Sequence, residues 1–192
     1  KSLVVFDTGS ADLFMDKSSY HPKLSLASKN LHKPFDFSYA SLHVYGDVYL
    51  DDVSIGGVKA KHVPVGHGSK DFDGDDTGGT FGLSFATAEN RVYGVEQDTF
   101  MWAAKKQHPI QSSSFQFTLR RHGKASLNVG DIDHSELAGP ISWADENADK
   151  TFWRTSVLLN GNKIENAIVD SGTNVITGPN DQVKAVLDQL DG

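Results

Sequence analysis

The fold is decided by two short stretches, Val4-Val5-Phe6-Asp7-Thr8-Gly9-Ser10 and Ala167-Ile168-Val169-Asp170-Ser171-Gly172-Thr173. Each is an apolar run that predicts a buried strand, followed by aspartate, a small hydroxyl residue, glycine and another small hydroxyl residue. An aspartate and a glycine at the end of one strand are ordinary turn formers. Because Asp170 repeats the pattern 163 residues after Asp7, the two copies instead indicate one active-site loop in each of two related lobes.

The residue types suit a pair of carboxylates that share a proton. Two carboxylates about 3 Å apart cannot both ionise, so one proton stays with the pair. The ionised member can take a proton from water while the protonated member donates one to a carbonyl oxygen. Gly9 and Gly172 permit the two backbones to approach closely.

The hydroxyl residues of the two motifs are expected to support these carboxylates. Thr8 and Ser171 can brace one loop against the other through hydrogen bonds. Ser10 and Thr173 can each hold the carboxylate of their own motif in place.

Strand signals dominate the rest of the chain. Residues 43–65 predict two or three strands with a hairpin turn at Gly56-Gly57. Residues 155–169 predict a hairpin across Asn160-Gly161, because this dipeptide suits a turn with positive φ values.

Helical periodicity is confined to two segments. Residues 96–107 carry apolar side chains at helical spacing, and residues 180–190 do so more clearly, with Asn180 as the expected cap.

Composition excludes several classes of protein. With 192 residues, 38% of them hydrophobic, the chain can bury a sizeable core, and it has no apolar run of the length that a membrane span needs. The absence of cysteine excludes disulfides, thiol catalysis and cysteine-ligated metals. A net charge of −7 argues against a nucleic-acid partner, and the eight histidines lack the spacing of a zinc site.

Several stretches together resemble the pepsin-like aspartic proteases. They match the two active-site segments, the flap hairpin, a hydrophobic-hydrophobic-glycine step behind the first aspartate, the stretch between the lobes and the start of the second lobe. In that order they are residues 6–14, residues 167–173 with 177–179, Phe37-Ser38-Tyr39 with Gly46-Asp47 and residues 52–57, Thr80-Phe81-Gly82-Leu83, residues 127–133 and Phe152-Trp153. The resemblance covers nearly all of the chain.

The resemblance implies a mostly β, bilobal acid-protease fold. Residues 1–140 would form the N-terminal lobe with the first aspartate loop and the flap. Residues 141–192 would form the inter-lobe segment and the start of the C-terminal lobe, which is incomplete in this chain. Asp7 and Asp170 become the catalytic dyad by the same resemblance.

The implied activity is that of an aspartic endopeptidase, which hydrolyses peptide bonds at acidic pH through a water molecule activated by the dyad. Peptide or protein substrates would lie in an extended cleft under a flap formed by Tyr39, Ala40 and Ser41. Statine-type inhibitors would bind between the aspartates. The resemblance implies no metal, other cofactor, nucleic acid or membrane, and a secreted or an acidic vacuolar or lysosomal location.

The sequence departs from the family pattern in three ways. The flap reads Tyr39-Ala40-Ser41-Leu42-His43 where the family has Tyr-Gly-Thr-Gly-Ser. Phe14 replaces a tryptophan whose N–H would bond the flap tyrosine. The leading strands and most of the second lobe are missing, so we expect a fragment of a longer protein rather than a naturally short family member.

The sequence leaves two alternatives to an aspartic endopeptidase with both aspartates in one chain. A non-catalytic pepsin-like binding protein or inhibitor decoy would account for the altered flap, although both aspartates are intact. A single-lobe protease that dimerises is disfavoured, because one chain already carries two aspartate loops.

Overall fold

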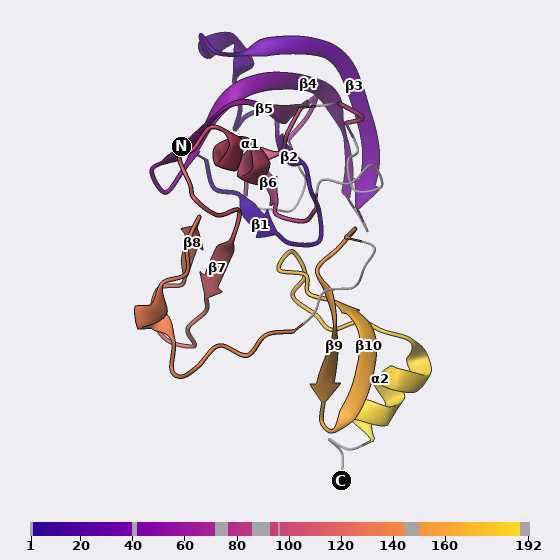
Figure 1. Ribbon diagram of the computed structural model, residues 1–192. Helices are drawn as coiled ribbons and strands as arrows, with labels where there is room; N and C mark the ends of the chain where they lie inside the picture. The colour runs from indigo at the N-terminus through magenta and orange to yellow at the C-terminus, as the bar shows by residue number, and fades with distance from the viewer. Residues whose placement is uncertain are drawn as a thin grey trace.

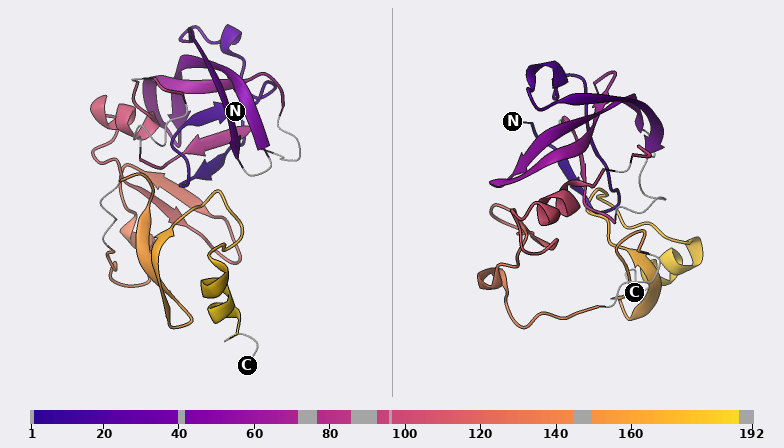
Figure 2. Two further views of the ribbon diagram at one scale, coloured as in Figure 1. Left: turned by 90° about the vertical axis from the view of Figure 1, so that its right-hand side faces the viewer. Right: turned by 45° about the horizontal axis from the view of Figure 1, so that its top comes forward.

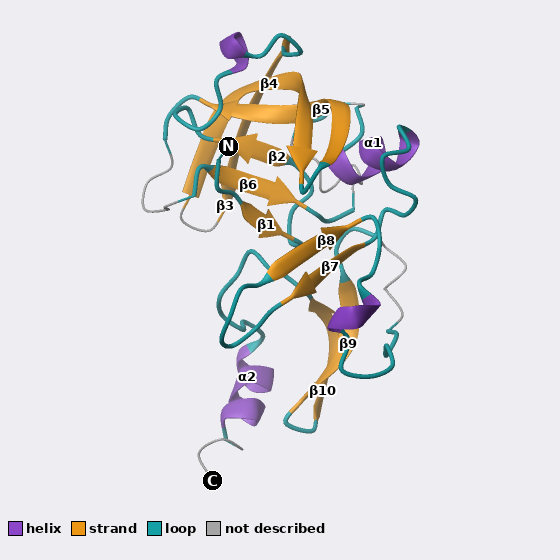
Figure 3. Cartoon of the chain, turned by 90° about the vertical axis from the view of Figure 1, so that its left-hand side faces the viewer, coloured by secondary structure: helices purple, strands orange, loops and turns teal. Residues whose placement is uncertain are grey.

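A computed structural model describes residues 2–39, 42–71, 77–85, 93–95, 97–144 and 150–188. Strands predominate in these ranges (Figure 3) and form one six-stranded sheet and two two-stranded sheets. This architecture confirms the mostly β fold class. The elements are β1 (Val5–Asp7), β2 (Leu13–Met15), β3 (Lys29–Tyr39), β4 (Leu42–Ile55), β5 (Val58–Gly68), β6 (Gly79–Gly82), α1 (Phe100–Lys106), β7 (Phe115–Thr118), β8 (Ser126–Val129), β9 (Arg154–Leu159), β10 (Asn162–Ile168) and α2 (Asn180–Leu187), with short 3-10 turns at Pro22–Leu24 and His134–Glu136.

The six-stranded sheet has the order β1-β6-β2-β5-β4-β3. Strand β6 lies between β1, to which it is parallel, and β2, to which it is antiparallel. The chain therefore leaves β1 through the first aspartate motif, passes the end of β6 and returns as β2. A Cβ on Gly82 would lie 2.4 Å from the Ala11 carbonyl carbon, so only glycine fits where the loop crosses. The structure therefore confirms the expectation that the segment containing Gly82 crosses behind the loop of the first aspartate.

Strands β3, β4 and β5 form a long curved antiparallel ribbon (Figure 1). The turn between β4 and β5 is the predicted Gly56-Gly57, and both residues have positive φ, 55° and 90°. Glycine adopts this backbone conformation without steric cost, so the dipeptide fixes the hairpin where the sequence places it.

Two apolar clusters support the sheet. One joins β2, β5 and β6 to α1, and its members include Val63, Val65, Phe81, Phe100 and Ala104. The other lies under β3 and β4 and consists of Phe14, Phe35, Val44, Val48 and Tyr93. Helix α1 is shorter than the predicted helix over 96–107 and presents its apolar side to the first cluster.

The β9–β10 hairpin turns at Asn160 and Gly161, with φ values of 47° and 79°, as predicted. The expectation of a buried strand at residues 167–169 is wrong, because Ile168 and Val169 are 46% and 54% exposed. The cause is the small sheet: β10 pairs with β9 alone among the described strands.

Helix α2 begins at Asn180 itself, and the capping position is occupied by Pro179 without a side-chain hydrogen bond. The predicted cap is therefore wrong by one residue, although the helix is where its periodicity places it.

The β7–β8 ribbon and the β9–β10 hairpin with α2 lie at one end of the six-stranded sheet, below it in Figures 1 and 2. The predicted boundary near residue 140 stays a prediction; it falls in residues 137–144, where the structure has neither helix nor strand. Within the described ranges, no helix is both long and apolar enough to cross a membrane.

Candidate active site

The two aspartate loops are held together by hydrogen bonds between their hydroxyl residues. The Thr8 N–H donates to Ser171 Oγ at 3.1 Å, and the Ser171 N–H donates to Thr8 Oγ1 at 2.9 Å. Each hydroxyl also donates across to a backbone oxygen of the opposite strand, Thr8 to Val169 at 2.7 Å and Ser171 to Phe6 at 2.6 Å. The brace expected from the sequence is therefore present and nearly symmetric.

Each motif glycine lies against the aspartate of the other motif. A Cβ on Gly9 would be 2.6 Å from Cγ of Asp170, and a Cβ on Gly172 would be 2.4 Å from Oδ1 of Asp7. Real Cβ atoms do not approach this closely, so the two carboxylates occupy space that any other residue type would fill. The glycines thus permit the aspartates to meet across the two loops.

The two carboxylates differ in their own hydrogen bonds. Asp7 accepts from the Gly9 N–H at 2.8 Å and from Ser10 Oγ at 2.5 Å. Asp170 accepts from the Gly172 N–H at 2.8 Å. The hydrogen bond expected from Thr173 to Asp170 is not formed within the described part of the chain, because Thr173 is exposed whereas Ser10 is buried.

Burial raises the pKa of Asp7 above its usual value of 3.8. The neighbouring Asp170 side chain raises this pKa further, through hydrogen bonding and through its charge, whereas the hydrogen bonds from Ser10 and Gly9 lower it. The net direction is upward, because desolvation penalises the charged form and a second carboxylate disfavours a second negative charge. The arrangement therefore favours a pair that keeps one proton.

The flap lies largely outside the described residues. Tyr39 ends β3 and pairs with Leu42, but its side chain and the predicted flap residues Ala40 and Ser41 are outside that part of the chain. Phe14, which replaces the family's tryptophan, is 1% exposed and packs edge-on against Phe37 at 5.4 Å between ring centroids. It contributes to the apolar cluster under β3 and β4.

Trp153, which the sequence pattern does not single out, forms hydrogen bonds to segments beside both aspartate loops. Its indole N–H donates to the Leu83 backbone oxygen at 3.0 Å, and its own backbone oxygen accepts from the Val169 N–H at 2.9 Å. The signal available was a tryptophan in a segment that matches the family, since a buried indole usually finds an acceptor.

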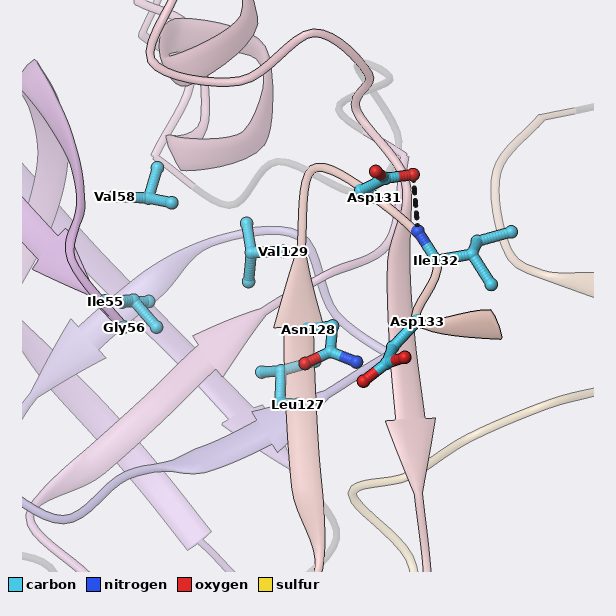
Figure 4. Close-up of a pocket in the computed structure, with 9 residues that line it drawn as sticks. All are labelled: Ile55, Gly56, Val58, Leu127, Asn128, Val129, Asp131, Ile132 and Asp133. Atoms are coloured by element: carbon cyan, nitrogen blue, oxygen red, sulfur yellow. Dashed lines mark hydrogen bonds between the residues drawn. The ribbon is translucent and has the colours of Figure 1, made fainter. Parts of the chain in front are cut away.

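No described residues form a group of three or more histidine, cysteine, aspartate or glutamate side chains that could hold a metal ion. A pocket of about 360 Å³ lies between the Gly56 turn and β8 (Figure 4). Its apolar side is formed by Ile55, Val58 and Val129. Neither Asp7 nor Asp170 lines it, so this pocket is separate from the paired carboxylates.

Comparison with known proteins places these features in a family. The family model described as "Eukaryotic aspartyl protease" matches residues 1–192. "Secreted aspartyl protease 1" of Malassezia globosa is 37% identical over 194 residues, covering 100% of this chain and 48% of that protein. "Aspergillopepsin-1" of Emericella nidulans is 33% identical over 187 residues, covering 89% and 47%. "Probable inactive secreted aspartyl protease" of Malassezia globosa is 30% identical over 183 residues, covering 91% and 46%. The chain spans about half the length of these curated relatives.

Proposed function

Because the chain belongs to the eukaryotic aspartyl protease family, we propose that Asp7 and Asp170 are the catalytic dyad of an aspartic endopeptidase that works at acidic pH. The observation that carries the proposal is the reciprocal packing of each carboxylate against the other motif's glycine. A pair of structural turns would not need the two side chains to share one confined space.

The proposed reaction is hydrolysis of a peptide bond without a covalent intermediate. The ionised carboxylate takes a proton from a water molecule while the water oxygen bonds to the carbonyl carbon, and the protonated carboxyl gives its proton to the carbonyl oxygen. The proton held by the first carboxylate then passes to the amide nitrogen as the C–N bond breaks, and the second carboxylate takes back a proton from one hydroxyl of the intermediate as the carboxyl product forms. Thr8 and Ser171 keep the loops in register, and Ser10 orients Asp7.

The natural substrates are proposed to be peptides or proteins that bind in an extended conformation, with Tyr39, Ala40 and Ser41 closing over them. Inhibitors of the statine type, whose hydroxyl replaces the attacked water, should bind between the aspartates. A secreted location is proposed, supported by the similarity to a protein named as a secreted aspartyl protease, and an acidic vacuolar or lysosomal compartment is the alternative. Nucleic acid, membrane, metal and other cofactors have no part in the proposal.

The proposal is tested by exchanging each aspartate for its amide in the complete protein. Asp7→Asn or Asp170→Asn should each reduce cleavage of haemoglobin at acid pH below about one per cent of the unsubstituted rate, because neither leaves a pair that can share a proton. Asp181→Asn, at an exposed site in α2, is the matched control and should retain full activity. Substantial cleavage by either dyad variant would refute the proposed mechanism.

A non-catalytic binding protein is the second candidate. Two observations favour it: the flap sequence lacks the family's glycines, and one relative is named as probably inactive. Under this alternative the unsubstituted protein would bind a statine-type inhibitor without cleaving peptides, which isothermal calorimetry and a cleavage assay on one preparation would distinguish.

A further inference from the structure

Trp153 connects the backbone beside one aspartate to the backbone beside the other. Its indole N–H donates to the Leu83 backbone oxygen at 3.0 Å, and the Leu83 N–H donates to the Asp7 backbone oxygen at 2.7 Å. On the other side, the Trp153 backbone oxygen accepts from the N–H of Val169 at 2.9 Å, and Val169 directly precedes Asp170. Three hydrogen bonds, joined by the covalent chain of Leu83 and Trp153, therefore connect Asp7 to Val169, the residue before Asp170.

The indole ring is fixed by two aromatic neighbours. The Phe85 ring lies 4.2 Å from it between centroids, and the Phe115 ring lies 5.6 Å away at an interplanar angle of 83°. These contacts restrict rotation of the side chain, so the N–H stays directed at Leu83. Because Phe85 follows β6 and Phe115 belongs to β7, the ring is held by segments that precede the second aspartate motif by more than 50 residues.

A second connection runs beside the first. The Ser84 N–H donates to the Ser10 backbone oxygen at 2.8 Å, and Ser84 Oγ donates to the Thr151 backbone oxygen at 3.0 Å. Residues 83 and 84 thus bond the first aspartate loop on one side and residues 151–153 on the other. The indole N–H and the Ser84 hydroxyl both donate hydrogen bonds at this junction.

We propose that Trp153 is a positioning residue that sets the separation and relative orientation of the Asp7 and Asp170 carboxylates. The inference rests on the proposed function. Thr8 and Ser171 tie the loops to each other, whereas Trp153 ties the strand that leads into Asp170 to the backbone behind Asp7. Displacement of a reacting group by about 1 Å can reduce a rate by about 100-fold, so a small shift of this strand affects the reaction.

The test is Trp153→Phe in the complete protein, which keeps an aromatic ring and removes the N–H. Trp143→Phe is the matched control, because Trp143 is 81% exposed. We expect Trp153→Phe to reduce kcat by about tenfold or more with little change in KM. We also expect its pH profile to narrow on both sides, because weaker coupling between the carboxylates brings their two apparent pKa values together. Trp143→Phe should leave kcat, KM and the profile unchanged.

The outcomes separate positioning from packing. If Trp153→Phe does not fold, the benzothienyl analogue of tryptophan, in which sulfur replaces the N–H, keeps the ring shape and takes its place in the test. A folded variant with the unsubstituted kcat and pH profile would overturn the inference. The inference would also be overturned if the activity lost by Trp153→Phe equalled its unfolded fraction and its pH profile were unchanged. If the unsubstituted protein does not cleave peptides, both the proposed function and this inference are wrong. If it is active and Trp153→Phe has the same kcat and pH profile, only the inference is wrong.

Discussion

Replacement of Gly172 by alanine offers a direct measure of how closely the aspartates approach. The added Cβ would lie 2.4 Å from Oδ1 of Asp7 and 3.2 Å from Oδ1 of Asp170. Ordinary contact begins at 3.4 Å, so the Asp7 carboxylate and the Gly172 backbone must separate by about 1 Å. A displacement of this size at a reacting group corresponds to about a 100-fold loss of rate. We therefore expect Gly172→Ala to reduce kcat by about two orders of magnitude.

The fold should survive the same substitution. Gly172 does not have a positive φ, so alanine can adopt its backbone conformation. Alanine at such a position stabilises a protein by about 0.4–1 kcal/mol through the unfolded chain, which offsets part of the cost of the displaced carboxylate. The thermal midpoint of Gly172→Ala should therefore remain close to that of the unsubstituted protein.

The assay compares three glycine variants in the complete protein by steady-state cleavage of a fluorogenic peptide at acid pH. Gly9→Ala repeats the test from the opposite loop, because its Cβ would lie 2.6 Å from Cγ of Asp170. Gly139→Ala is the matched control, since a Cβ there meets nothing within 4 Å. If folded Gly172→Ala and Gly9→Ala retained kcat within about twofold of the control, the close approach of glycine and carboxylate would be wrong.

Two further predictions concern stability. Thr8→Val removes a hydroxyl that donates to Val169 at 2.7 Å and accepts from Ser171 at 2.9 Å; denaturant unfolding should show a loss of about 1–3 kcal/mol, because the partners lose their bonds, and the exposed Thr173→Val should show almost none. Since the pKa of Asp7 is raised in the folded protein, folding binds protons, so the free energy of unfolding should fall as the pH rises from the usual value of 3.8 through the raised one. In Asp7→Asn this part of the pH dependence should disappear, and an unchanged pH dependence would contradict the raised pKa.

The sequence predicted those parts of the site that depend on residue type alone. Aspartate, hydroxyl residue and glycine recur in fixed order, and the contacts between the two copies follow from that order. The Gly56-Gly57 and Asn160-Gly161 turns were predictable for the same reason, because positive φ values strongly favour these residue types.

Contacts between segments distant in sequence could not be predicted in this way. Tyr93 places its hydroxyl 2.5 Å from the Leu13 backbone oxygen, and Trp153 places its indole N–H on Leu83. Nothing in the spacing of these residues indicates an acceptor 70 or 80 positions earlier. The exposure of Ile168 could not be predicted either, because an apolar run indicates a buried strand but not how many other strands pack beside that strand.

The two copies of the motif differ in their surroundings, which the sequence repeat did not indicate. The first aspartate ends β1, a half-buried edge strand of the six-stranded sheet, and the loop that follows is buried, with Ser10 against the carboxylate. The second follows a two-stranded hairpin, where Thr173 is exposed and bonds no carboxylate within the described residues. Two closely similar motifs therefore place their carboxylates in unequal surroundings. The pair keeps one proton because two negative charges so close together are disfavoured, and the unequal surroundings make the two carboxyls differ in how readily each one holds it.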